Sequence, residues 1–126
     1  MILKFQSGIN INVLNIFGSP QLIDGVMRDT LSIEVSPKNI EYNNLKSIFT
    51  DSSNTFILYS FDTNNEEYEI GKGYTIFVSI TDENRKIKHE PGYFGPDEYE
   101  EVYIVKLAQM TYSEYQLQQL NNQPSD

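Results

Sequence analysis

The strongest constraint on the fold is a strict alternation of side chains over residues 73–81. In an extended chain, one face of this segment carries only large apolar side chains, namely Tyr74, Ile76, Val78 and Ile80. A period of two with β-branched and aromatic residues is typical of a β-strand. We therefore predict a central strand at residues 73–81 that pairs with further strands at residues 56–61 and 68–70.

Other segments show the same period of two. Apolar and polar residues alternate over residues 9–17, 31–35 and 101–107, and turn formers such as Asp24-Gly25 separate these segments. The sequence Gly18-Ser19-Pro20 is expected to end the strand that precedes it. The fold prediction is a mainly β domain of the α+β class, built as a small antiparallel sheet or sandwich.

Two short segments change from strand to helical spacing. Four apolar residues between positions 42 and 49 lie on one stripe of a helix predicted over residues 41–49. Thr111 and Glu114 have the spacing of a capping box, which predicts a C-terminal helix to about Leu120. We predict one domain over residues 1–120 and a frayed tail at residues 121–126.

The charge balance limits the possible partners. The chain of 126 residues has 18 acidic and 9 basic side chains, which gives a formal net charge of −9. Such a surface repels the phosphates of nucleic acids and anionic lipids, so we expect neither partner. Cysteine is absent, which excludes disulfides and thiolate metal sites. No apolar run approaches the ~20 residues of a membrane helix, so we expect a soluble protein.

Few groups could carry catalysis or bind a metal. His89 is the only histidine and lies between Lys88 and Glu90, so we interpret it as a solvated loop residue. Residues 62–67 are rich in oxygen ligands but lack the EF-hand order, which favours a polar hairpin turn. The sequence Gly71-Lys72-Gly73 lacks the P-loop pattern and is predicted to be a tight connection. Spacing alone leaves open a carboxylate pair assembled by the fold. We expect no enzyme activity, no cofactor and no metal.

A loop over residues 89–99 is the best candidate for a contact surface. Its proline and glycine residues interrupt regular pairing, so we predict that this loop is mobile. Three aromatic residues stand here among carboxylates: Tyr93, Phe94 and Tyr99. Exposed aromatic rings make good anchors for a protein partner or for sugar rings. An alternative is that one or two of them fold back over the edge of the sheet.

The order of these segments resembles a group of viral proteins. The likeness is carried by four stretches: ILKFQSGININV, RDTLSIEVSP, IFTDSSNTFILY and AQMTYSEYQLQQL. They resemble small proteins encoded among the tail and baseplate genes of phages and prophages of Gram-positive bacteria. The resemblance covers most of the chain except residues 81–99. It implies a structural or accessory role, in the host cytoplasm during assembly or in the virion, and brings no active-site residues.

Two functions are therefore expected as alternatives. The first is a non-catalytic structural or assembly protein of a phage tail region, whose partners are other tail proteins or a second copy of itself. The second is a small carbohydrate-binding module in which Tyr93, Phe94 and Tyr99 form a platform that stacks on sugars.

Overall fold

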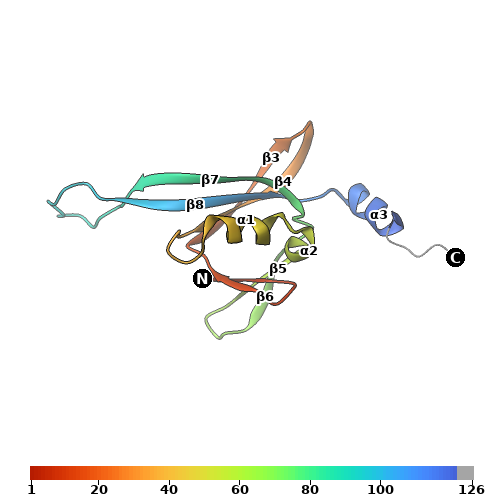
Figure 1. The fold of residues 1–126 in the computed structure, drawn as a ribbon, viewed down its shortest axis with the longest axis horizontal. Coiled ribbons are helices and arrows are strands. Elements are labelled where there is room, and N and C mark those ends of the chain that lie inside the picture. The colour runs from red at the N-terminus through yellow and green to blue at the C-terminus, as the bar shows by residue number, and fades with distance from the viewer. Residues whose placement is uncertain (122–126) are drawn as a thin grey trace.

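The protein is built from two four-stranded antiparallel sheets. In the computed structural model, which describes residues 1–121, one sheet has the order β2-β1-β5-β6 and the other has the order β3-β4-β8-β7 (Figure 1). The first sheet consists of β1 (Ile2–Phe5), β2 (Asn10–Asn12), β5 (Ile57–Phe61) and β6 (Glu67–Lys72). The second consists of β3 (Asn15–Ile23), β4 (Val26–Val35), β7 (Ile76–Lys86) and β8 (Tyr99–Ala108).

The helices complete the predicted mainly β, α+β fold. They are α1 (Tyr42–Thr50), the short α2 (Ser52–Thr55) and the C-terminal α3 (Tyr112–Asn121). The mid-chain and C-terminal helices were both expected from the sequence, and the sandwich-like arrangement of two sheets is confirmed. The short α2 was not predicted from the sequence; the Asp51 carboxylate accepts a hydrogen bond from Ser53 N and caps it. Apart from Asn121, which ends α3, the predicted tail lies outside the described residues.

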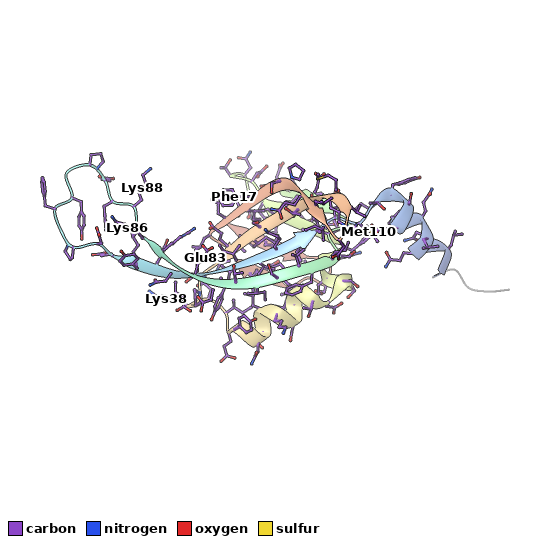
Figure 2. The ribbon with its side chains drawn as sticks, turned by 90° about the horizontal axis from the view of Figure 1, so that it is seen from above. Phe17, Lys38, Glu83, Lys86, Lys88 and Met110 are labelled. Carbon is purple, nitrogen blue, oxygen red and sulfur yellow. The ribbon has the colours of Figure 1, made fainter. Side chains whose placement is uncertain are left out.

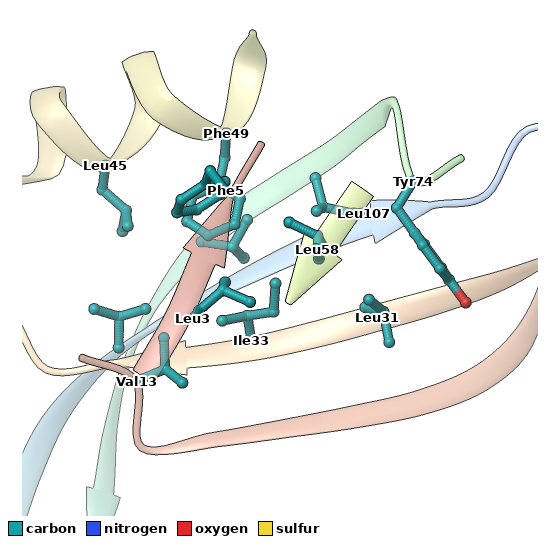
Figure 3. Packing of buried hydrophobic residues seen from close by; sticks show 12 residues of the cluster. Leu3, Phe5, Val13, Leu31, Ile33, Leu45, Phe49, Leu58, Tyr74 and Leu107 are labelled. Carbon is teal, nitrogen blue, oxygen red and sulfur yellow. The ribbon is translucent and has the colours of Figure 1, made fainter. Parts of the chain in front are cut away.

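The core lies between the two sheets and beneath α1 (Figure 3). Leu3 and Phe5 of β1 are fully buried, as are Leu45 and, to within 1%, Phe49 of α1. The Phe49 ring meets the Phe5 ring edge to face, with centroids 5.2 Å apart. Leu45 and Phe49 are four residues apart, so they share one helix face. A helix of nine residues is marginal alone, and this packing stabilises it.

The chain crosses from one sheet to the other at two points, and neither crossing was predicted from the sequence. Val13 N donates to Met1 O in the first sheet, whereas Leu14 N donates to Glu34 O in the second. The single strand predicted over residues 9–17 is therefore wrong, because β2 and β3 belong to different sheets. The second crossing is at Gly73, whose N–H donates to Phe56 O and whose carbonyl accepts from Met110 N.

The predicted central strand is an edge strand. β7 pairs only with β8, so the prediction that it pairs with residues 56–61 and 68–70 is wrong. The side chains that share one face of β7 also differ from the prediction, because a bulge lies between Phe77 and Ser79. One extra residue in a strand reverses the faces beyond it. All four apolar residues from Ile76 to Ile80 are half-buried, but Phe77 and Ile80 are the two that pack against the core cluster.

The hairpin of β3 and β4 confirms the predicted turn at Asp24-Gly25. The strand break predicted at residues 18–20 is wrong. Asp24 and Gly25 both have positive φ, 50° and 81°, as the two central residues of a tight hairpin turn require. However, β3 continues through Pro20 to Ile23, where the sequence was expected to break. β3 is an edge strand, and an edge strand tolerates a proline that lacks an N–H.

Candidate interaction surfaces

The β7–β8 hairpin extends beyond the body of the molecule and ends in the loop of residues 87–98 (Figures 1 and 2). Pairing continues from Ile76–Ala108 to Lys86–Tyr99, and Ile87 N donates to Glu98 O at 2.7 Å. Residues 82–86 thus extend β7 beyond the strand predicted over residues 73–81. Tyr99 is the first residue of β8 and does not belong to the loop.

The three aromatic residues predicted as contacts lie at this end of the hairpin, and we call them the aromatic tip. Phe94 is 98% exposed, and Tyr93 and Tyr99 are also exposed. Among the described residues, no ring pair joins two members of the tip. Each of the three rings is therefore presented to solvent separately.

Tyr93 is held by contacts within the loop. Its ring stacks on the His89 ring with centroids 3.7 Å apart, and its hydroxyl donates to Pro96 O at 3.1 Å. The same hydroxyl lies 3.2 Å from Glu98 Oε1. A Cβ at position 95 would lie 2.4 Å from this hydroxyl, so a side chain at this position would displace the Tyr93 ring. Tyr93 thus shapes the loop, while the neighbouring Phe94 is left in solvent.

The opposite end of the molecule carries α3, which begins with the predicted capping box (Figure 1). Glu114 N donates to Thr111 Oγ1 at 3.2 Å, and Thr111 N donates to Glu114 Oε1 at 2.7 Å. Arg28 of β4 donates two hydrogen bonds to the Glu114 carboxylate, at 2.5 and 2.8 Å, and a third to Gln109 O. The helix is therefore attached to the β3–β4 hairpin through one bidentate ion pair.

This ion pair shifts the titration of both partners. The hydrogen bonds from Arg28, with a further one from Thr111 N, lower the pKa of Glu114 to about 2. The hydrogen bond to Glu114 raises the pKa of Arg28. The Arg28 side chain is 8% exposed and that of Glu114 is 42% exposed, so the guanidinium is the buried partner. Since a buried charge depends on its partner, Glu114 is needed to keep α3 in place.

An apolar cavity of about 390 Å³ lies where α3 meets the body, and we call it the α3 cavity. The Phe56 and Tyr115 rings are stacked in it, with centroids 5.8 Å apart and planes 17° from parallel. Lys72 Nζ lies 5.9 Å from the Phe56 centroid and 5.8 Å from the Tyr115 centroid, within the range of cation–π attraction. Met110 and Tyr112 also line the cavity.

α3 turns its leucines away from the body. Tyr115 stacks on Phe56, whereas Leu117 and Leu120 are exposed, as is Tyr112 in the first turn. An amphipathic helix of a soluble monomer normally buries such a stripe. The end of the molecule that carries α3 thus offers apolar side chains to solvent, as the aromatic tip does at the other end.

Within residues 1–121, no group of three or more His, Cys, Asp or Glu side chains lies close enough to hold a metal ion. The Asp62 carboxylate of the predicted hairpin turn accepts hydrogen bonds from Asn64 N and Glu66 N, and so closes the turn between β5 and β6. No helix of the described chain is long and apolar enough to cross a membrane.

The sequence predicted the aromatic tip but not the α3 cavity. Phe56, Lys72 and Tyr115 come from three segments that are far apart along the chain, and their meeting depends on the crossing at Gly73. A Cβ at Gly73 would lie 3.3 Å from Met110 Cγ, and its φ of +84° favours glycine. Near the α3 cavity, the only local feature of the sequence that we interpreted was the pair of glycines around Lys72. These glycines predicted a tight connection and gave no indication of a cavity.

Comparisons of this chain with protein-family models, with curated proteins and with solved structures find no match.

Proposed function

We propose that this chain is a non-catalytic structural or assembly protein of a phage or prophage tail region, acting through protein–protein contacts. The observation that supports this proposal is the pair of projections at opposite ends of the molecule (Figure 1). One exposes Phe94 and Tyr99, and the other exposes Tyr112, Leu117 and Leu120. Large apolar side chains on projecting elements are typical of surfaces that become buried in a complex.

A genetic test asks whether tails need these surfaces. In a lysogen that carries the gene, the gene is deleted, and induced particles are counted by electron microscopy. Wild-type protein and the Phe17→Ser variant should restore normal tails, whereas Phe94→Ser should not. Phe17 is the matched control, because it is an exposed phenylalanine on β3, outside both projections. Normal tails in the deletion strain would refute the proposal.

A glycan-binding screen tests the carbohydrate alternative on the same variants. The proposal predicts no glycan binding by the wild-type protein. Binding that disappears after replacement of Tyr93, Phe94 and Tyr99 by alanine would instead favour a carbohydrate-binding module. The stacking of Tyr93 on His89 supports the protein-contact proposal, because one face of that ring is already covered.

A further inference from the structure

We propose that the protein associates head to tail, with Phe94 of one copy entering the α3 cavity of a second copy. This inference rests on the proposed function, because it names a second copy as one of the partners of the two projections. In this arrangement, the aromatic tip of one copy binds the α3 cavity of the next.

The two surfaces fit in chemistry. Phe94 is a fully solvated ring at the turn of a projecting hairpin, next to the fixed Tyr93. The α3 cavity is open, is lined by Phe56, Met110, Tyr112 and Tyr115, and at about 390 Å³ has the size of a small-ligand pocket. An aromatic ring that enters it can pack against rings and a thioether, both favourable partners for a phenyl group.

The charges of the two surfaces are complementary. Residues 87–98 contain three carboxylates, Glu90, Asp97 and Glu98, and one lysine. Asp97 pairs with Lys86 at 3.1 Å, so Glu90 and Glu98 carry the remaining negative charge of the loop. At the other end, Lys72 lies over two rings and forms no ion pair with any carboxylate of residues 1–121. In a chain with a net charge of −9, few surfaces attract an acidic loop. Opposite charges around an apolar contact steer association and set its orientation.

The geometry makes this contact intermolecular. The tip lies at one end of the long axis and α3 lies at the other (Figure 1), with Met110 and Lys88 far apart in Figure 2. The tip therefore cannot enter the cavity of its own chain. A contact between two different surfaces leaves one free tip and one free cavity in every complex, so copies continue to add until a ring closes or a filament grows.

Sedimentation velocity over a range of concentrations tests the proposal. The wild-type protein should form species larger than dimers as its concentration rises, and the Phe17→Ser control should behave in the same way. Phe94→Ser and Lys72→Glu should each weaken self-association by on the order of thirtyfold, the effect of losing one central contact. Thermal melts confirm that both variants fold.

A mixing experiment then distinguishes head-to-tail contact from other modes. Phe94→Ser keeps an intact cavity and Lys72→Glu keeps an intact tip, so the mixture should form a 1:1 heterodimer and nothing larger. A symmetric dimer that both variants retain, or a mixture that stays monomeric, would overturn the proposal. So would a wild-type protein that is monomeric at near-millimolar concentration. The proposed tail function would survive these results if the deletion strain still lacked normal tails.

Discussion

The two ends of the molecule are held in opposite ways. The aromatic tip is the continuation of a sheet, because β7 and β8 remain paired up to Lys86 and Tyr99. α3 pairs with no strand and is held by side chains, through the Arg28–Glu114 ion pair and the Phe56–Tyr115 stack. The direction of the tip is therefore set by many backbone hydrogen bonds, while the position of α3 depends on contacts between side chains.

This difference also separates the two candidate surfaces. Phe94 is almost fully exposed, so we expect that its replacement leaves the backbone of the loop unchanged. The α3 cavity exists only while α3 is docked, because Tyr112 and Tyr115 form part of its wall. Conditions that release α3 should therefore abolish the cavity and leave the tip intact.

The largest expected effect comes from breaking the attachment of α3. Glu114→Ala should reduce the free energy of unfolding by about 3 kcal/mol, since it leaves the buried Arg28 guanidinium without its carboxylate. This value is at the low end for buried pairs, because Glu114 is partly solvated. Urea denaturation measures the total loss, and hydrogen exchange should show that the amides of α3 lose protection first.

Glu100→Ala is the matched control for this variant. Glu100 lies 3.2 Å from Arg85 Nε, but it is exposed, and Arg85 also binds Glu34. Its loss should cost less than about 1 kcal/mol, as for other surface ion pairs. Equal effects of the two variants would contradict the view that α3 depends on its ion pair.

Acidification should release α3 without changing the tip. The pKa of Glu114 is about 2 in the folded chain, below its ordinary value of 4.5. A lowered pKa means that the stabilisation is complete above the ordinary value and is lost as the pH falls towards 2. Solvent screening of this carboxylate limits the loss to about 1–2 kcal/mol. NMR shifts of α3 amides should follow this titration, and the Glu114→Gln variant should show none of it.

Local signals in the sequence predicted the local structure well. The Asp24-Gly25 turn, the Thr111–Glu114 capping box and the helical stripe that buries Leu45 and Phe49 all depend on neighbours within four residues. The aromatic tip belongs to the same group, because its aromatic residues are close together in the sequence. Such features are read directly from spacing and residue type.

The pairing of strands could not be read in this way. Alternation over residues 73–81 predicted a strand, but it contains no information on which strand lies beside it or on the bulge at Val78. The assignment of β7 to the sheet of β8 follows from the crossing at Gly73, which depends on contacts with Phe56 and Met110. The α3 cavity was missed for the same reason, since long-range contacts bring its walls together.

In the β7–β8 hairpin, we expect one substitution to have a smaller effect that stabilises the fold. A hydrogen bond with Asp82, together with the charge of Asp82, raises the pKa of Glu101. A raised pKa means that the favourable contribution is present at low pH and is lost as the pH rises through the folded pKa. Glu101→Gln should therefore raise the melting temperature slightly at neutral pH and have no effect in acid. Glu83→Gln, which removes the same charge from the opposite face of β7, should have a smaller effect at neutral pH.

The smallest effect is expected from shortening the tip. Deletion of residues 91–96 removes the Tyr93–His89 stack and Phe94, but it leaves the Ile87–Glu98 closure and the whole β7–β8 ladder. Halving the loop also lowers the entropy cost of closing it by about 0.6 kcal/mol, which offsets the lost stack. The free energy of unfolding should therefore change by less than about 0.5 kcal/mol. A loss above about 2 kcal/mol would show that the loop supports the fold, and the contrast between a stable tip and a dependent α3 would then fail.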